Sequence, residues 1–357
     1  AFGYYPNLTS ITIPASVTTI GGAAFMNCSS LASVTIAENS QLVSIESSAF
    51  KNCSNLSSFT LPASVTSIEN DAFWGTGLTS FIIPENSQLA TIGDWVFNGS
   101  AGLTTISFPA SLTSIGYYAF NTCNFTSITC NAVTPPSINN SFPSTDASAL
   151  VYVPAASVEA YKAANGWSKF TNIQPIIIGS GTCGDNLTWK LIDSGELIIE
   201  GTGTMYNYSN NPAAPWHSYR SLIKSVNVKD GVTSIGSWAF AQCSALTDVS
   251  IAESVTSIGG DAFRECRILE EVILPTGLTQ LGTGVFLYCD ALKSIIVPEG
   301  VTIIGSDTFE FCPNLNSITF PGGLTEIGPW ALQGANKLAS ITCKATIPPS
   351  IGNDAFG

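Results

Sequence analysis

Residues 255–273 read VTSIGGDAFRECRILEEVI, and close copies of this line recur on both sides of it. The Phe of its Ala-Phe pair marks the phase, because the same position returns every 23 residues in the second half of the chain and every 23 to 25 residues in the first half. The markers are Phe2, Phe25, Phe50, Phe73, Phe97, Phe120, Phe240, Phe263, Phe286, Phe309 and Leu332. A fixed period of this length predicts a β-rich solenoid, in which each repeat buries its apolar side against its neighbours.

Each repeat begins with a short strand. Leu8, Ile11 and Ile13 alternate with Ser and Thr, so their side chains enter the core while the hydroxyls face solvent. Pro14 then ends the strand, because it has no N–H to donate. A glycine follows a second apolar pair, where we expect a turn with positive φ, and the Ala-Phe pair fills the bend. These glycines are Gly21, Gly93, Gly116, Gly236, Gly259, Gly282, Gly305 and Gly328.

The repeated unit resembles the BspA-type leucine-rich repeats. The resemblance is carried by LTSITIPASVTTIGGAAFMNCSSL, residues 8–31, and LTDVSIAESVTSIGGDAFRECRIL, residues 246–269, and it extends over about two thirds of the chain. It implies a right-handed, leucine-rich-repeat-like solenoid on an extracellular protein that is secreted or anchored at the cell surface. Some members of this family act as adhesins. No catalytic residues and no cofactor come with the resemblance.

The repeats predict two arrays in tandem, each with a cap of different sequence. Residues 1–178 form the first array, whose C-terminal cap covers 131–177, after the repeat pattern degrades. Residues 179–231 form an N-terminal cap for the second array, built on a β-hairpin that turns at 193–195. Residues 232–357 form the second array, and its last segment copies the opening of the first cap, so we expect that second cap to be truncated.

Two local features depart from the repeat. Residues 157–164, SVEAYKAA, predict a short amphipathic helix that is N-capped by Ser157 and followed by Trp167. Two turns are longer by two residues, at 38–41 and 85–88, where ENSQ replaces Pro-Ala-Ser. We expect slightly bulged loops at these two places.

The composition narrows the classes of partner. Charged residues make up 10% of the chain, against roughly 25% in typical soluble domains. The formal net charge of −13 leaves no basic face for phosphates, so nucleic acid is disfavoured as a partner. No apolar run approaches the roughly 18 residues that span a bilayer, so we expect no membrane insertion of this fragment. Because the chain starts within a repeat, we expect any signal peptide or anchor to lie outside it.

Ten cysteines raise the question of disulfides. Stacked copies of one repeat position point the same way, so their side chains would have to twist to reach a disulfide dihedral near 90°. We therefore expect buried free thiols, with bridges as the alternative, and no metal site. Seven of them lie three residues after the marker, Cys130 and Cys343 take the last apolar slot of a strand, and Cys183 stands apart. The seven are Cys28, Cys53, Cys123, Cys243, Cys266, Cys289 and Cys312.

Catalysis has few candidate residues here. His217 is the only histidine, so a His-based triad or a multi-His metal site cannot be assembled. A carbohydrate-active enzyme, either a glycoside hydrolase or a polysaccharide lyase, is the alternative function, because paired carboxylates suffice for that chemistry. Asp261 and Asp307 share a repeat position but are two turns apart, and Glu270 and Glu271 are adjacent on a strand and point to opposite sides.

The position two residues before the marker varies between repeats and carries aromatic residues. Trp95 and Tyr118 occupy it on successive turns, with Tyr117 beside them and Trp74 on the preceding turn. We predict that these four rings bind an extracellular protein or glycan; the alternative is that they pack over the bend. The exposed strand positions are monotonous by comparison, which argues against recognition there. They are Thr12, Thr35, Thr60, Ile82, Ser107, Thr129, Ser250, Ile273, Ile296, Thr319 and Thr342.

Overall fold

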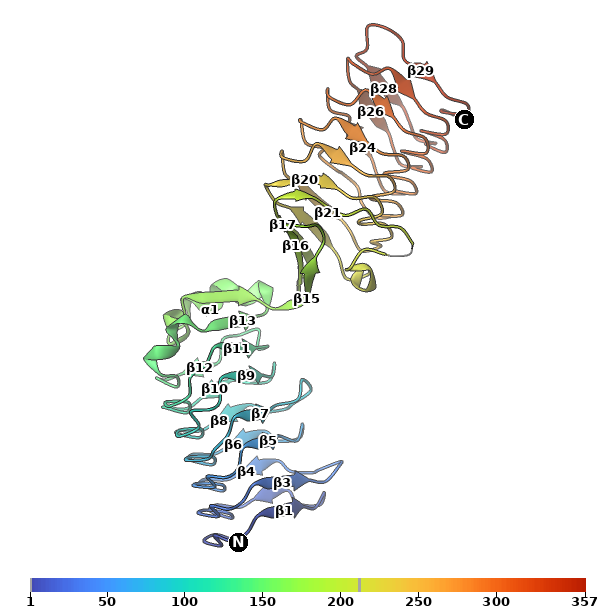
Figure 1. Ribbon diagram of the computed structural model, residues 1–357. Helices are drawn as coiled ribbons and strands as arrows, with labels where there is room; N and C mark the ends of the chain where they lie inside the picture. The colour runs from blue at the N-terminus through green and yellow to red at the C-terminus, as the bar shows by residue number, and fades with distance from the viewer. Residues whose placement is uncertain (1, 211–212) are drawn as a thin grey trace. The chain divides into compact units, whose positions relative to one another are not determined.

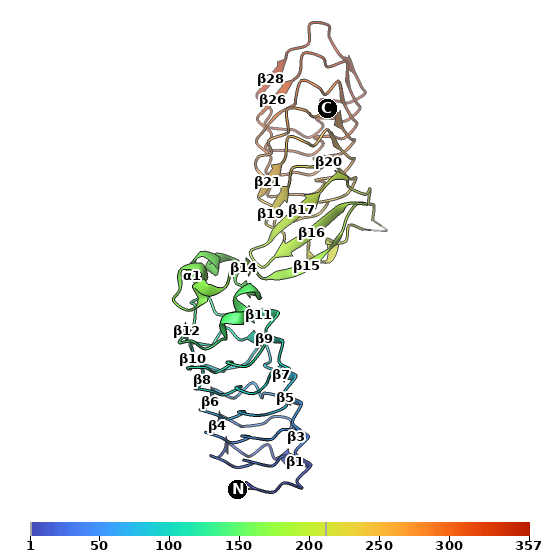
Figure 2. The same ribbon diagram turned by 60° about the vertical axis from the view of Figure 1, so that its left-hand side comes forward.

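The computed structural model describes residues 2–210 and 213–357. The chain divides into two compact units, Ala1–Ile176 and Ile177–Gly357. Each unit is a solenoid of stacked turns in which most strands pair in parallel with the equivalent strands of the next turn, as Figures 1 and 2 show. No helix in the described ranges is long and apolar enough to cross a bilayer.

A six-stranded parallel ladder runs along one side of the first unit without interruption. Each strand has two residues and ends in a buried isoleucine, so that one isoleucine lies over the next from turn to turn. The strands are β2 (Thr19–Ile20), β4 (Ser44–Ile45), β6 (Ser67–Ile68), β8 (Thr91–Ile92), β10 (Ser114–Ile115) and β12 (Ser137–Ile138).

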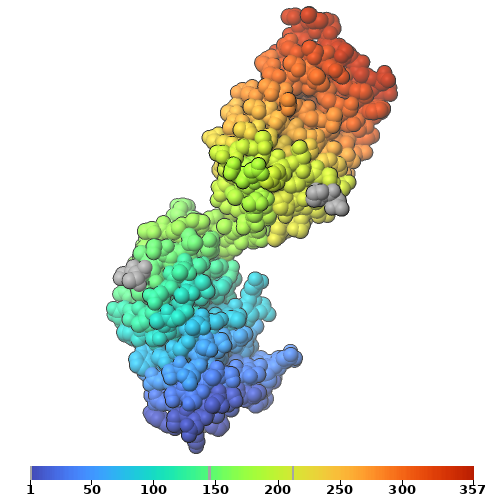
Figure 3. Space-filling view, viewed as in Figure 1, coloured from blue at the N-terminus to red at the C-terminus, as the bar shows by residue number. Residues whose placement is uncertain are grey.

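The longer strands form a second face that is interrupted twice. The breaks separate β3 from β5 and β7 from β9, the two steps in which the ENSQ inserts lengthen the repeat. Both inserted loops project from the first unit (Figures 1 and 3). The inserts were expected only to bulge, but strand pairing is also interrupted at both places. The strands are β1 (Ser10–Ile13), β3 (Ser33–Ile36), β5 (Ser58–Thr60), β7 (Ser80–Ile82), β9 (Thr105–Phe108), β11 (Ser127–Cys130), β13 (Leu150–Val153) and β14 (Asn172–Pro175).

The marker phenylalanines form a column of stacked rings in the core. Phe73 and Phe97 lie 5.6 Å apart between centroids, with an interplanar angle of 5°. Phe263 and Phe286 repeat this geometry in the second unit, at 5.6 Å and 7°. All four rings are fully buried. One aromatic residue per turn thus gives each unit a continuous core, as the period of the sequence predicts.

The expectation of positive φ at the repeat glycines is wrong. None of the eight has its φ in the left-handed region. They are needed because adjacent turns approach closely: a Cβ on Gly259 would lie 2.4 Å from the Ser237 nitrogen, and one on Gly282 would lie 2.4 Å from the Gly260 nitrogen. The left-handed residues come two positions later in each turn. They are Ala23, Ser48, Asp71, Trp95, Tyr118, Trp238, Asp261, Gly284, Asp307 and Trp330.

A cap closes the first unit. The predicted helix is present as α1 (Val158–Ala163), and Tyr161 and Trp167 are fully buried. The predicted N-cap is wrong, because the Ser157 hydroxyl makes no cap hydrogen bond and donates to the Val133 carbonyl at 2.7 Å. The remaining short helices of this cap are η1 (Ser144–Ser148), η2 (Ala155–Ser157) and η3 (Trp167–Lys169).

The second unit begins with three antiparallel strands. Gly195, with φ of 92°, makes the turn of the predicted hairpin between the second and third of these strands. The third strand then pairs in parallel with the first solenoid strand, so the hairpin continues directly into the ladder. The elements are β15 (Ile177–Thr182), β16 (Leu187–Ile192), β17 (Glu196–Gly201), η4 (His217–Tyr219), β19 (Ser225–Val228) and β21 (Asp248–Ile251).

The long-strand ladder of the second unit is broken once, at residues 271–274. Among the residues that the structure describes, the only strand pairing of this segment is an isolated bridge between Glu271 and Ser294. The strands beyond the break are β24 (Ser294–Ile296), β26 (Ser317–Phe320) and β28 (Ser340–Cys343). The short strands of the unit are β18 (Gly203–Thr204), β20 (Val232–Ile235), β22 (Ser257–Ile258), β23 (Gln280–Leu281), β25 (Ile303–Ile304), β27 (Glu326–Ile327) and β29 (Ser350–Ile351).

All ten cysteines are free, and nine are buried. Their repeat position has a physical reason, because the thiol of each later turn reaches back to a phenylalanine carbonyl. Cys53 Sγ donates to the Phe25 oxygen at 3.1 Å, and Cys289 Sγ donates to the Phe263 oxygen at 3.2 Å. The expectation for Cys343 is wrong: it is exposed, because β28 is the outermost strand of its ladder among the described residues.

Candidate functional site

The structure brings together three of the four predicted aromatic residues. The Trp95 ring lies 4.7 Å from Tyr118 and 5.9 Å from Tyr117 between centroids, and the two tyrosine rings are 3.9 Å apart. All three are half-buried, so their remaining surface faces solvent. We call Trp95, Tyr117 and Tyr118 the first bend cluster.

The backbone explains why this cluster stands out from the fold. Trp95 and Tyr118 have φ of 59° and 52°. A bulky residue rarely adopts this conformation, because its Cβ crowds the backbone. The fold does not require an aromatic there, since Ala23 and Ser48 occupy the same position on other turns. Trp95 and Tyr118 are therefore large side chains at positions whose backbone does not favour them.

Trp74 lies outside the cluster and pairs with a cation. The Lys51 ammonium sits 4.6 Å from the centroid of the Trp74 ring and 3.3 Å from the Asp71 carboxylate. Cation–π contacts of this kind order both side chains. Trp74 therefore belongs to a separate Lys51–Asp71–Trp74 group on the same array.

Polar atoms border the first bend cluster. The Tyr117 N–H donates to the Asp94 carboxylate at 2.7 Å, and a side-chain hydrogen bond with Tyr118 raises the pKa of Tyr117. The Asn98 backbone N–H donates to the Trp95 carbonyl at 3.2 Å. The Asn98 Oδ1 is buried and has no partner in the described part of the chain.

A second aromatic group in the second unit escaped the sequence analysis. The Arg264 guanidinium lies 5.4 Å from the Trp238 ring and 5.9 Å from the Tyr288 ring, and Arg267 lies 5.5 Å from the Tyr288 ring. The Tyr288 ring stacks on Phe311 at 4.9 Å. The sequence does contain a pattern that could have predicted the Tyr288–Phe311 contact: both residues lie two positions after the marker on successive turns. Both also have positive φ.

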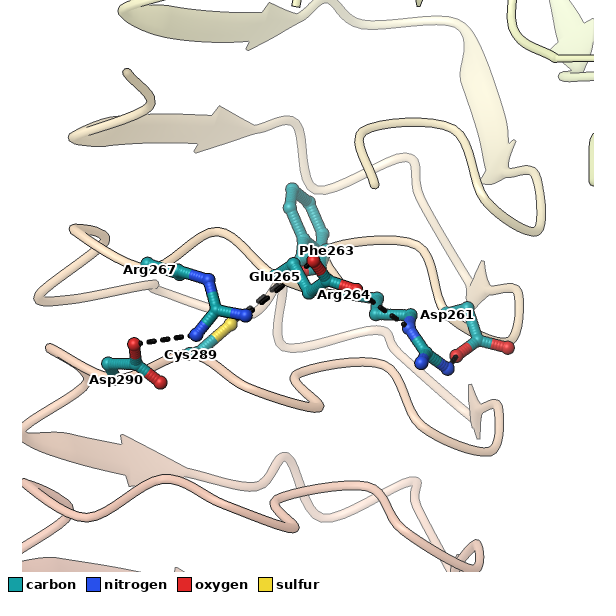
Figure 4. Close-up of polar contacts among 7 residues, drawn as sticks. All are labelled: Asp261, Phe263, Arg264, Glu265, Arg267, Cys289 and Asp290. Carbon is teal, nitrogen blue, oxygen red and sulfur yellow. Dashed lines mark hydrogen bonds and ion pairs between the residues drawn. The ribbon is translucent and has the colours of Figure 1, made fainter. Parts of the chain in front are cut away.

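An ion-pair network accompanies this group (Figure 4). Arg264 contacts Asp261 and Glu265, each at 3.4 Å. Arg267 contacts Glu265 at 3.6 Å and Asp290 at 3.0 Å. Burial raises the pKa of Asp261, while the hydrogen bond with Asp290 raises the pKa of Arg267. Both arginines are therefore already neutralised by carboxylates, and the network joins two turns.

Two of the carboxylates that the sequence singled out have other partners in the structure. Asp261 is bound to Arg264 and leans over Gly284, where an added Cβ would lie 2.7 Å from its Oδ1. Asp307 belongs to the turn beyond that glycine. His217 lies in η4, and burial lowers its pKa. Within residues 2–210 and 213–357, no group of three or more acidic, Cys or His side chains is placed to hold a metal ion.

Comparison with known families settles what kind of chain this is. The family described as "BspA type Leucine rich repeat region (6 copies)" matches residues 1–126, 75–152 and 217–339, which together make up more than half of the chain. The chain belongs to the BspA-type leucine-rich repeat family. The resemblance found in the sequence and the leucine-rich-repeat solenoid predicted from it are both confirmed.

The chain is similar to several solved structures. A leucine rich cell surface protein from Faecalibacterium prausnitzii is 27% identical over 96% of this chain and 81% of its own, with a TM-score of 0.35. The Treponema pallidum leucine rich repeat protein is 21% identical over 48% of this chain and 85% of its own, with a TM-score of 0.39. The pneumococcal vaccine antigen PcpA is 21% identical over 89% and 71%, with a TM-score of 0.33. Among curated proteins, no sequence matches the chain.

Proposed function

We propose that this leucine-rich repeat protein is a non-catalytic binding protein that acts outside the cell, either secreted or anchored at its surface. It engages an extracellular protein or glycan through the first bend cluster. The observation that carries the proposal is the contact of Trp95 with Tyr117 and Tyr118 on backbone that disfavours bulky side chains. Clustered aromatic rings supply contact area at a low cost in conformational entropy.

The surroundings of the cluster favour binding over catalysis. The Asp94 carboxylate, which borders the cluster, accepts a hydrogen bond from the Tyr117 backbone N–H. No observation favours the carbohydrate-active enzyme, because Asp261 is held by Arg264 and separated from Asp307 by a turn.

A glycan and matrix-protein array tests the proposal. We expect the purified chain to bind at least one ligand, and the double variant Trp95→Ala, Tyr118→Ala to lose affinity by a factor of about ten or more, because each ring contributes about 1 kcal/mol. Trp330→Ala is the matched control, since Trp330 has the same repeat position and left-handed backbone in the second unit. Equal binding by the double variant and the unchanged chain would exclude the first bend cluster as the site.

A further inference from the structure

The strand face of the second unit carries two exposed isoleucines on adjacent turns. Ile273 is 84% exposed and Ile296 is 68% exposed. The bridge between Glu271 and Ser294 sets the register, which places Ile273 directly beside Ile296. The equivalent residues on the flanking turns are Ser250 and Thr319, so this apolar pair interrupts a hydroxyl surface.

These isoleucines line a groove of about 650 Å³. Buried Val272, Leu274 and Val297 also line it, so its surface is apolar between the two turns. The two exposed isoleucines form one contiguous apolar patch rather than two isolated residues, and contiguous apolar surface is the kind that interaction sites use. The strand face was expected to be uniform along the array. It is uniform on the turns that expose Ser or Thr, but the turns of Ile273 and Ile296 depart from it.

The groove coincides with the break in the ladder, which leaves backbone groups unpaired. On an intact turn, Val297 N–H donates to the Thr319 carbonyl at 2.9 Å. Its equivalent, Leu274 N–H, makes no backbone hydrogen bond within the described ranges, and neither the N–H nor the C=O of Ile273 makes one. Backbone N–H and C=O groups that have no partner in the fold form hydrogen bonds with water or with a bound molecule.

Polar residues border both ends of the groove, and their ion pairs are already made. At one end Glu299 accepts from Lys344 at 2.7 Å and from the Gly322 N–H at 2.8 Å. At the other end Lys293 pairs with Glu270. An apolar centre with a polar rim is the common anatomy of a protein interface.

Glu271 makes the groove favour a positively charged partner. Its side chain is exposed and lines the groove, and it makes no ion pair among the residues described. The other lining carboxylate, Glu299, is neutralised by Lys344. A cationic side chain is therefore the complement that this surface lacks.

We propose that this groove binds an extended polypeptide segment with an aliphatic side chain next to a lysine or arginine. The aliphatic side chain packs between Ile273 and Ile296, and the basic one pairs with Glu271. The segment lies across the two turns and covers the amides of Ile273 and Leu274. A glycan has no aliphatic side chain to pack between the isoleucines. This peptide groove is separate from the first bend cluster, which lies in the first unit.

A phage-displayed library of random linear peptides, panned on the purified 357-residue chain, tests the proposal. We expect enrichment of Ile, Val or Leu next to Lys or Arg. A synthetic peptide from the enriched set should bind the double variant Ile273→Ser, Ile296→Thr about tenfold more weakly or worse. Both substitutions install residue types that stand at this strand position on flanking turns, so the fold is retained.

Two controls make the result specific. Ile82→Thr changes the corresponding exposed isoleucine of the first unit, which is 53% exposed, and should leave peptide binding unchanged. Hydrogen exchange should show that the peptide slows the amides of Ile273 and Leu274.

Several results would overturn the proposal. One is a panning that enriches no such peptide, and another is a bound peptide that the Ile273→Ser, Ile296→Thr variant binds equally well. The third is an unchanged exchange rate at the amides of Ile273 and Leu274. If the double variant instead dissociates a dimer of the chain in sedimentation, or loses a glycan, the occupant is a second copy or a saccharide and the peptide assignment is wrong.

Discussion

Trp95 and Tyr118 pack ring against ring across two turns, 4.7 Å apart, although both residues hold the left-handed backbone conformation. The two facts oppose each other energetically. The ring contact stabilises the bend, whereas a side chain at positive φ destabilises it by roughly 1 kcal/mol or more. The surface of the first array therefore gains little stability from these aromatics, and their exposed faces remain available for a ligand.

Replacing Trp95 by glycine and by alanine separates the two effects. Both variants lose the ring contacts with Tyr117 and Tyr118, but only glycine tolerates φ of 59° without strain. We expect Trp95→Gly to unfold at a higher urea concentration than Trp95→Ala, with a difference of about 1 kcal/mol. Gly284 shows that glycine fits this repeat position, with φ of 62°. A less stable glycine variant would mean that the backbone conformation at Trp95 is not strained.

The close approach of turns predicts a strong effect of alanine at Gly259. Its added Cβ would lie 2.4 Å from the Ser237 nitrogen, and the backbone of a neighbouring turn cannot move aside cheaply. We expect Gly259→Ala to lower the free energy of unfolding by about 2 kcal/mol or more. Gly277→Ala is the control, because its nearest atom would be the Glu253 oxygen at 3.5 Å. Equal melting temperatures of the two variants would contradict the packing argument.

Periodicity predicted the core because the core is the part of a solenoid that every turn repeats. The marker phenylalanines, the free buried thiols and the helix at 157–164 all follow from local pattern. The φ of the repeat glycines could not be predicted in this way. A glycine can serve a left-handed turn or a close approach, and only the position of the next turn distinguishes the two.

The surface was less accessible to sequence reasoning than the core. Trp95 and Tyr118 were predicted as neighbours, since they share a position on successive turns. The contact of Trp74 with Lys51 was not predicted, because it depends on side-chain direction. The groove at Ile273 arises from a break in strand pairing, and the sequence of that turn keeps the regular 23-residue spacing. Nothing in the period could reveal it.

Thiol reactivity should single out Cys343. It is the only exposed cysteine of the ten, and all ten lie in the described ranges. Burial raises the pKa of Cys53, Cys243 and Cys312 to about 12, so these thiols carry almost no thiolate at pH 8. We expect one rapidly labelled thiol per native chain and ten after denaturation without a reductant. Cys343→Ser should remove the rapid phase, whereas four or five disulfides in the unreduced protein would contradict the assignment of free thiols.

Lowering the pH should stabilise the cap of the first unit, because Asp146 becomes protonated. This side chain is buried, its Oδ1 accepts from the Phe125 N–H at 3.2 Å, and its Oδ2 has no partner in the described chain. Burial raises the pKa of Asp146 from 3.8 to about 6. Because the folded pKa lies above the unfolded one, the stabilisation is complete below about pH 4 and is lost as the pH rises through 6.

Asp146→Asn tests this by removing the charge while keeping the shape. We expect it to raise the free energy of unfolding at pH 7 by about 1 to 3 kcal/mol, because a shift of one pKa unit corresponds to 1.36 kcal/mol. The gain should vanish at about pH 3, which lies below both the unfolded pKa of 3.8 and the folded pKa of about 6, so that Asp146 is protonated in both states. Asp248→Asn, an exposed aspartate on β21, is the control and should change stability little at either pH. Urea unfolding at the two pH values measures the difference. An Asp146→Asn variant that is less stable than the unchanged chain at pH 7 would contradict the prediction. It would show that the charged carboxylate is needed, either as an acceptor for the Phe125 N–H or as a partner for Lys169.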